Sequence, residues 1–232
     1  VWVVRLPERG RAELDRAGGA AVEVGKRRLV RLLLARGAAD DETLRALRGL
    51  AWQLEACGSY EEAGLLLGRA AEASGPALGR SHPRTLEALH DLGAVLAQMR
   101  EYARAEPALR GALEGRERLL GPLHPETAES RATLAALLAA MRRHGEAESL
   151  LRRAASSARE ALGPTHPDAL AAAESLAYLL RATGRHQEAE PLQRGVLEGY
   201  RERLGPAHPS ALAAANGLAA LLLLAGRPAE AE

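Results

Sequence analysis

The chain has 232 residues, of which 47% are hydrophobic and 26% are charged, and its 31 basic and 30 acidic residues leave a net charge of +1. This composition can support a buried core, which excludes an intrinsically disordered polymer, and the balanced charge gives no reason to expect a nucleic-acid or acidic-membrane partner. The single cysteine, Cys57, excludes an intramolecular disulfide and a two-cysteine metal or redox site.

Residues 1–39 lack the repeat that occupies the rest of the chain, and we interpret them as an N-terminal cap or the tail of a preceding domain. Val1 to Leu6 predicts a short strand or such a tail, and Pro7 to Gly10 predicts a turn. From about Ala20 to Arg36, leucines among charged residues predict one helix that caps the first repeat. Its basic run, Lys26 to Arg28, is interpreted as a solvated face.

Four His-Pro dipeptides recur at intervals of 42 residues, and such a fixed period indicates tandem structural repeats. The dipeptides begin at His82, His124, His166 and His208. One period before His82 lies Asp40, where a first repeat without the dipeptide begins. The predicted repeats are residues 40–81, 82–123, 124–165 and 166–207, followed by an incomplete fifth repeat, 208–232, whose second helix would begin near Pro228.

Each repeat is predicted to form two antiparallel helices. The abundant Ala, Leu, Arg and Glu favour helices, and the alternating β-branched and aromatic residues of a propeller blade are missing. In the second repeat, leucines recur at three- and four-residue steps from Leu86 to Leu96. We expect this helix to begin at Pro83 with His82 as its N-cap, and the second helix to end before Gly121, because glycine tolerates the positive φ of a helix C-terminus.

A small residue in every first helix identifies the type of repeat. The tetratricopeptide pattern has a leucine followed by a small residue in its first helix, and an alanine four residues before a large apolar residue in its second. The first element occurs as Leu50-Ala51, Leu92-Gly93, Leu134-Ala135, Leu176-Ala177 and Leu218-Ala219. The second occurs in the complete repeats with one departure, at Gln193. We therefore predict an all-α fold, a right-handed solenoid of antiparallel helix pairs forming a tetratricopeptide-like superhelix.

The motifs also resemble a known group of repeats. Leu-Gly-x-x-His-Pro, Leu-Ala-x-Leu-Leu and the Glu-Ala-Glu-Pro-Leu of Glu188 to Leu192 resemble the units of kinesin light chains and nephrocystin-3. The resemblance covers about residues 40–232 and specifies the repeat type rather than the protein. It implies a non-catalytic scaffold that binds a peptide segment of a partner in a concave groove. Because residues 1–39 show no apolar heptads, it does not imply a motor subunit.

In tetratricopeptide proteins, a second stripe on each first helix lines this groove. Carried over in register, the predicted groove residues are Arg45, Arg48, Trp52 and Glu55, then Glu87, His90 and Gln98, then Glu129, then Glu174, Tyr178 and Arg181, and finally Asn216. Alanines make the third repeat's stretch smoother and more apolar. Since aromatic and arginine side chains are common interface anchors, the end formed by Arg45, Arg48 and Trp52 is expected to prefer an acidic or aromatic segment. Kinesin light chains hold the peptide backbone with asparagines on this helix, and only Asn216 matches, so their cargo specificity is not carried over.

The seven histidines raise the hypothesis of a metal site, which the repeat spacing opposes. Zinc needs nitrogen ligands about 2.0–2.1 Å away, whereas equivalent residues of successive repeats are separated by two helix widths of about 8–10 Å each. Gly19 to Lys26 resembles a phosphate-binding loop only faintly, since its glycine spacing is wrong and Arg27 replaces the Ser or Thr. We therefore predict no enzymatic activity, no metal and no cofactor.

The sequence favours a cytoplasmic interaction scaffold with a protein or peptide partner and with no nucleic-acid or membrane partner. An alternative is that the repeats are the regulatory or sensory arm of a larger signalling enzyme, such as a nucleotide-binding ATPase or kinase. A third hypothesis is self-association through the fifth repeat, because the run from Leu221 to Leu224 is expected to be poorly covered.

Overall fold

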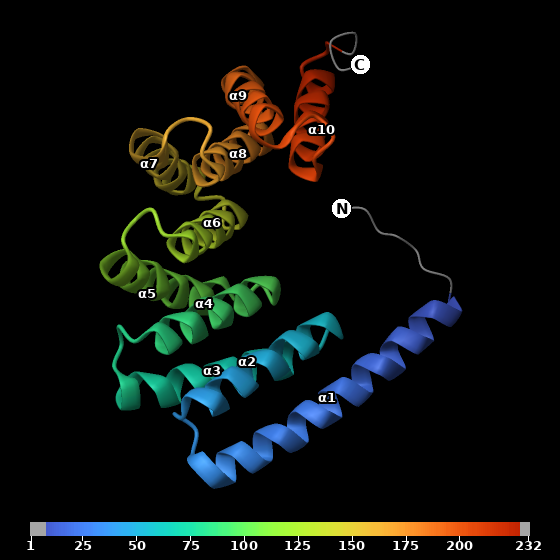
Figure 1. Ribbon diagram of the computed structural model, residues 1–232, viewed down its shortest axis with the longest axis vertical. Helices are drawn as coiled ribbons and strands as arrows, with labels where there is room; N and C mark the ends of the chain where they lie inside the picture. Colours follow the sequence, from blue (N-terminus) through green and yellow to red (C-terminus); the bar gives the residue numbers. More distant parts are fainter. Residues whose placement is uncertain (1–7, 228–232) are drawn as a thin grey trace. The chain divides into compact units, whose positions relative to one another are not determined.

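The computed structural model describes the backbone of residues 8–227 and the side chains of residues 20–227. Within that range all regular secondary structure is helical (Figure 1). The helices are α1 (Glu8–Arg36), α2 (Asp41–Ala56), α3 (Tyr60–Leu78), α4 (Pro83–Gln98), α5 (Tyr102–Leu120), α6 (Pro125–Ala140), α7 (His144–Leu162), α8 (Pro167–Ala182), α9 (His186–Leu204) and α10 (Pro209–Leu224). The predicted strand or tail at Val1 to Leu6 and the helix predicted near Pro228 lie outside the described residues.

The first helix is longer than predicted. α1 begins at Glu8, so the turn predicted for Pro7 to Gly10 is wrong from Glu8 onward. The surrounding Glu, Arg and Ala residues favour a helix, and they offset the cost of Gly10, which is about 1 kcal/mol. Further along α1, Val22 and Leu29 are buried in the same cluster as the leucines of α2.

The first helix of each repeat begins as predicted, directly after a capping residue. The four His-Pro histidines accept, at Nδ1, a hydrogen bond of 3.1–3.3 Å from the backbone N–H two residues further along the chain. In the first repeat, the Asp40 carboxylate has the same role toward Glu42 and Thr43. These bonds satisfy backbone donors that the helix itself leaves without acceptors.

The ends of the second helices also follow the prediction. They are followed by Gly79, Gly121, Gly163 and Gly205, whose φ angles lie between 86° and 99°. A residue with a Cβ is strained in this region, whereas glycine is not. The chain therefore turns sharply into the next repeat at the same place each time.

The described residues fold as two compact units, an N-terminal and a C-terminal one, divided between Gly115 and Arg116. In the N-terminal unit, α1 packs on α2, α2 on α3, and α3 on α4, while α2 also contacts α4. Its core consists mainly of leucines and alanines, among them Leu44, Leu47, Leu50, Leu54 and Leu67. In this unit, the first helices of the first two repeats therefore lie side by side.

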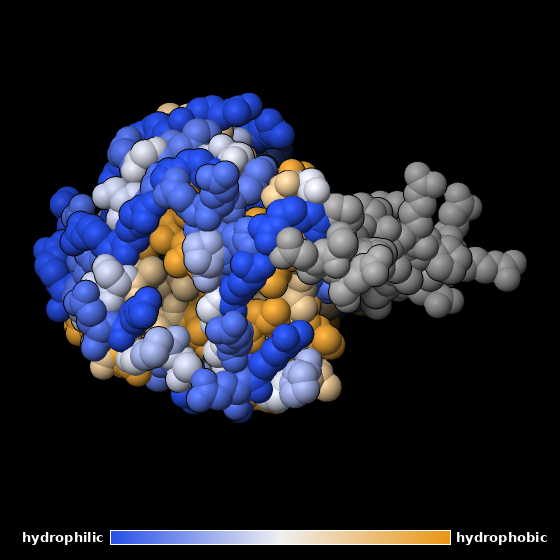
Figure 2. All heavy atoms as spheres, turned by 90° about the horizontal axis from the view of Figure 1, so that it is seen from above, coloured by the Kyte–Doolittle hydropathy of each residue, from blue (hydrophilic) through white to orange (hydrophobic). Residues whose placement is uncertain are grey.

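The C-terminal unit repeats the arrangement from α6 to α10. Consecutive helices pack on one another, and α6 also contacts α8. One core cluster joins α8, α9 and α10 through Leu170, Val196, Tyr200 and Ala214. Figure 2 shows hydrophilic ridges on the surface with apolar atoms exposed in the hollows between them. The polar faces of the first helices, and the hollows between these helices, are the features that a ligand would meet.

Candidate binding surface

Arg48 is the centre of the polar face that α2 and α4 share. Its Nε donates to the Asp91 carboxylate, its Nη1 lies 3.2 Å from Glu87 Oε2, and its guanidinium carbon lies 4.9 Å from the centre of the Trp52 ring. The guanidinium is thus stacked on one aromatic ring and paired with two carboxylates of the next repeat. Three predicted groove residues, Arg48, Trp52 and Glu87, are brought together here.

The ion pairs continue toward the N-terminal ends of both helices. Arg84 donates to Glu87 at 2.8 Å and to the Asp41 carboxylate, and Arg45 lies 2.7 Å from Asp41. The hydrogen bond from Arg84 lowers the pKa of Asp41, and the nearby charge of Arg45 acts in the same direction. Each arginine on this face therefore has a carboxylate within the protein, and the face carries no excess of positive charge.

The remaining predicted groove residues of the N-terminal unit differ in exposure. Trp52 is 57% exposed and Gln98 is exposed, while Glu55 is half-buried. Burial raises the pKa of the Glu55 carboxyl, and the charge of Asp91 adds to this effect. His90 is only 5% exposed, so its predicted place on the groove surface is wrong. It occupies the repeat position of Arg48, whose longer side chain reaches the surface, whereas a shorter imidazole stays within the helix layer.

In the C-terminal unit, Tyr178 is the most prominent of the predicted residues. It projects from α8 with 65% of its surface exposed, and the guanidinium carbon of Arg181 lies 5.4 Å from its ring centre. An exposed aromatic ring covered on one side by an arginine is a common element of protein interfaces. Two predicted groove residues, Tyr178 and Arg181, thus lie side by side on α8.

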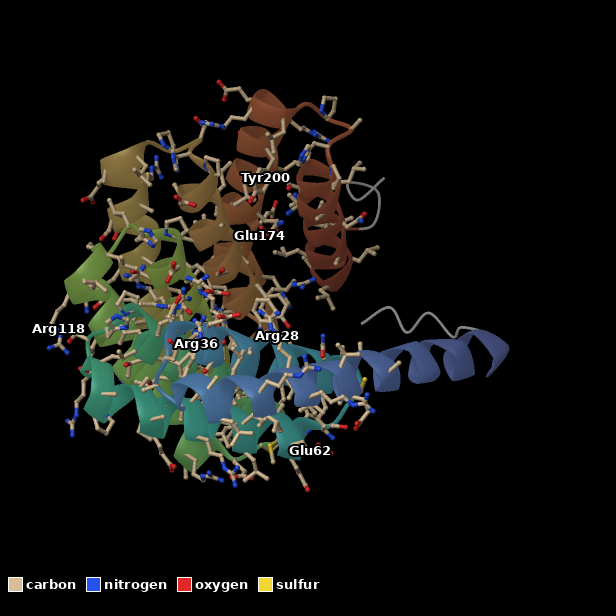
Figure 3. All side chains as sticks on the ribbon, turned by 60° about the horizontal axis from the view of Figure 1, so that its bottom comes forward. Arg28, Arg36, Glu62, Arg118, Glu174 and Tyr200 are labelled. Atoms are coloured by element: carbon tan, nitrogen blue, oxygen red, sulfur yellow. The ribbon has the colours of Figure 1, made fainter. Side chains whose placement is uncertain are left out.

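Glu174 lies one helical turn before Tyr178 and faces inward. Its carboxylate accepts a hydrogen bond from the Tyr200 hydroxyl on α9, and the two residues lie close together in Figure 3. Burial raises the pKa of Glu174, although the hydrogen bond from Tyr200 opposes this rise. Burial likewise raises the pKa of Tyr200, and the neighbouring carboxylate adds to it.

Two further predicted residues lie apart from this pair. Glu129 on α6 is exposed, with its carboxylate 3.5 Å from Nη1 of Arg116, a side chain only 2% exposed. Arg116 also donates to the Ser130 hydroxyl at 2.7 Å and to the Glu126 carbonyl at 2.9 Å. Asn216 is exposed on α10 and lines neither of the cavities between α6 and α8.

Two adjoining cavities, which we call the α6–α8 hollow, lie between these two first helices. The cavity near the N-terminal ends of α6 and α8 has a volume of about 240 Å³, and the one near their C-terminal ends about 470 Å³. Both include Ala132, Leu151 and Ser175 in their walls. Glu174 and Tyr178 line the larger cavity, so the hollow runs past the exposed aromatic ring.

The sequence contained a signal for one feature that the prediction missed. Arg48 with Asp91 and Asp41 with Arg84 are opposite charges 43 residues apart, one more than the repeat period. A scan for opposite charges at that offset would have paired them. No comparable signal marks the contact between Glu174 and Tyr200, because it depends on how deeply two helices pack.

Among the residues that the structure describes, no three His, Cys, Asp or Glu side chains form a group that could hold a metal ion. None of the described helices combines the length and apolarity needed to cross a membrane.

Comparisons with known proteins agree with this architecture. The model of the tetratricopeptide repeat family matches residues 92–160, 132–194 and 168–232, which together cover more than half of the chain. No curated protein matches the sequence.

Solved structures with similar folds include kinesin-light-chain-like proteins. A protein from Podosopora anserina, described as a kinesin light chain with nearly identical TPR-like repeats, is 28% identical with a TM-score of 0.71, covering 81% of this chain and 89% of that one. BtubC (BKLC) from P. vanneervenii has a TM-score of 0.71 at 16% identity, covering 95% and 86% of the two chains. Pseudomonas aeruginosa pilF has a TM-score of 0.58 at 18% identity, covering 96% and 90%. The last two similarities show the fold alone.

Proposed function

Because the chain belongs to the tetratricopeptide repeat family, we propose that it is a non-catalytic interaction scaffold that binds a peptide segment of a partner protein. The repeat fold is typical of such scaffolds. The finer part of the proposal is the location of the peptide, which lies along the exposed faces of the first helices. A location in the cytoplasm is part of the same proposal.

The observation that carries the proposal is the position of Tyr178 beside the α6–α8 hollow. Its ring is 65% exposed and borders a cavity of about 470 Å³ whose other walls are mainly alanine. Exposing an aromatic ring and an apolar cavity to water is unfavourable, and burying both against a ligand recovers that free energy. Tyrosine at the edge of an apolar hollow is also a frequent anchor of interfaces.

The end formed by Arg45, Arg48 and Trp52 supports peptide binding in a different way. An acidic ligand has to compete there with Asp91 and Glu87 for Arg48, so charge alone offers little gain. Trp52 keeps more than half of its surface exposed and has no such competitor. We therefore expect aromatic contacts with Trp52 to contribute more to affinity at this end than the acidic preference does.

Peptide selection with matched variants tests the proposal. Random twelve-residue peptides displayed on phage are selected on the purified chain, and enriched peptides are titrated calorimetrically. We expect Tyr178→Ala or Trp52→Ala to weaken binding at least about tenfold, as interface anchors do. Tyr60→Ala, which removes an exposed tyrosine from α3, should leave affinity unchanged. Selection without enrichment, or affinities that respond to none of the first-helix variants, would contradict the proposal.

A further inference from the structure

Beside the α6–α8 hollow, the third repeat has small side chains where the second and fourth repeats have large ones. Ala128 occupies the position of Leu86 and Leu170, and Ala158 occupies that of Arg116 and Tyr200. The first repeat has a large Leu44 at the former position and a small Ser74 at the latter. Both alanines line the smaller cavity. The hollow is therefore a local property of one repeat rather than a general feature of the solenoid.

The packing of the neighbouring repeats shows what the missing leucine would contact. Leu86 and Leu170 lie against Gly115 and Gly199, so closely that a Cβ on either glycine would collide with the leucine side chain. In the third repeat, Ala128 faces this place from α6, and the residue equivalent to the glycines is Ser157. The third repeat thus lacks both parts of the leucine–glycine pair that the second and fourth repeats have.

The smaller cavity, which Ala128 lines, has the size and lining of a pocket for one apolar side chain. Its volume is about 240 Å³, and six alanines line it, from α6, α7 and α8: Ala128, Ala132, Ala154, Ala158, Ala171 and Ala172. An apolar protein cavity of about 150 Å³ is enough to bind benzene. A leucine, methionine or phenylalanine side chain therefore fits, and its burial would recover the contacts that the alanines lack.

The charged residues around the smaller cavity favour a ligand in which the apolar side chain is next to a basic residue. Glu129 and Asp168 are the carboxylates in its wall, and Arg131 is the only base there. Arg131 is buried, and it bonds to the Glu117 carboxylate at 2.9 Å and to the Pro122 carbonyl at 3.1 Å, so its charge is balanced within the protein.

Arg116, a second basic residue near the smaller cavity, is also paired with carboxylates of the protein. It is almost fully buried, and its guanidinium lies 3.5 Å from the carboxylates of both Glu126 and Glu129. Together, Glu117, Glu126, Glu129 and Asp168 outnumber Arg116 and Arg131. The acidic excess faces the N-terminal ends of α6 and α8, beside the apolar pocket.

We propose that the α6–α8 hollow selects a peptide segment in which a large apolar side chain is adjacent to lysine or arginine. The apolar side chain occupies the cavity lined by Ala128 and Ala158, and the basic side chain lies against Glu129 and Asp168. The inference rests on the proposed function and specifies its ligand in the C-terminal unit. It assigns to this unit the opposite charge preference from the acidic one expected at Arg45 and Arg48.

Four synthetic peptides test both parts of the inference. All are nine residues long with blocked ends; the central residue is Leu or Ala, and it is flanked by two Lys or two Glu. We expect the Leu/Lys peptide to bind about tenfold or more tightly than the Ala/Lys peptide, because one large apolar side chain is buried. The Leu/Glu peptide should bind several-fold more weakly than Leu/Lys at low salt, with the gap narrowing as salt is added.

Variants that refill the cavity separate this site from others. Ala128→Leu combined with Ser157→Gly recreates the Leu86–Gly115 pair, so the variant should fold and lose the preference for Leu over Ala. Ala161→Leu, which adds the same volume at an exposed position of α7, should keep that preference. Glu129→Gln with Asp168→Asn tests the charge part separately and should remove the preference for Lys over Glu.

The outcomes distinguish the inference from the proposed function. Peptides that respond to Trp52→Ala while the refilled variant still prefers Leu would overturn the inference and leave the scaffold proposal standing. Methyl spectra of ¹³C-labelled alanine add an independent readout, because the Leu/Lys peptide should shift the methyls of Ala128, Ala154 and Ala158. Shifts confined to other alanines would also overturn it.

Discussion

Arg48 on α2 donates from Nε to the carboxylate of Asp91 on α4, and this contact ties together the first helices of the first two repeats. The same offset of 43 residues joins Asp41 to Arg84, with the signs of the charges reversed. Helices that lie one repeat apart are thus held in register by side chains as well as by their apolar core. The polar face predicted to bind a ligand also has this structural role.

Removing the charge of Arg48 should destabilise the N-terminal unit. Arg48→Met keeps most of the stem but withdraws the guanidinium from a buried Asp91, and we expect a loss of about 2 kcal/mol in the free energy of unfolding. Arg45→Met breaks an exposed pair with Asp41 and should cost much less, because solvent screens exposed ion pairs. Urea unfolding followed by circular dichroism measures both. If both variants lose the same free energy of unfolding, the contact between Arg48 and Asp91 does not stabilise the fold more than an exposed ion pair does.

Two glycines in the first helices give substitutions of opposite sign, and one of them, Gly93, occupies the small position of the tetratricopeptide pattern. Gly93→Ala should destabilise by about 1–3 kcal/mol, because its Cβ would lie 2.5 Å from Cγ of Leu109, even though other repeats have alanine at this position. Gly49→Ala meets nothing within 4 Å in the middle of α2 and should stabilise by about 0.5–1 kcal/mol. Thermal unfolding of both variants tests this contrast, which fails if Gly93→Ala also stabilises.

Features encoded by nearby residues could be predicted from the sequence. The start of α4 after His82 depends on a cap and a proline within three residues, and the end of α5 depends on Gly121. Trp52 and Tyr178 were placed on the exposed stripe by the helical period together with the register of the tetratricopeptide pattern. Predicting these helix ends and the side on which these residues lie does not require knowing which other helix each helix contacts.

Features that depend on packing depth could not be predicted in the same way. His90 shares the helical position of Arg48, and only the length of each side chain in its surroundings decides which of them reaches the surface. The α6–α8 hollow arises from absent atoms at Ala128 and Ala158, which belong to different helices. The helical pattern of the sequence reveals neither feature, since both depend on the space left between packed helices.

The histidine caps should tolerate replacement by other capping residues. His166→Ala removes the acceptor for the Asp168 N–H, and a lost cap costs about 1 kcal/mol. His166→Asn keeps a side-chain acceptor and should retain most of the stability, as Asp40 does at the start of α2. Unfolding temperatures of the two variants measure the difference. If both lose the same amount, the imidazole contributes through packing rather than through the cap.

Glu174 provides a pH-dependent prediction. Its pKa is raised in the folded chain, chiefly by burial, so the folded state binds the proton more tightly than the unfolded state does. The free energy of unfolding contributed by this group therefore falls as the pH rises from the ordinary carboxyl pKa through the raised one. The hydrogen bond from Tyr200 reduces the effect without reversing it.

Glu174→Gln should isolate this contribution, because glutamine stays neutral and its carbonyl still accepts the hydrogen bond from Tyr200. We expect the variant to be more stable than the parent chain at about pH 7, and the difference to shrink toward about pH 4, where the parent carboxyl becomes protonated. Glu198→Gln, at an exposed position on α9, controls for the change in net charge. Paired urea titrations across this range give the difference directly, and an advantage that grows on acidification would mean that the Tyr200 hydrogen bond outweighs burial.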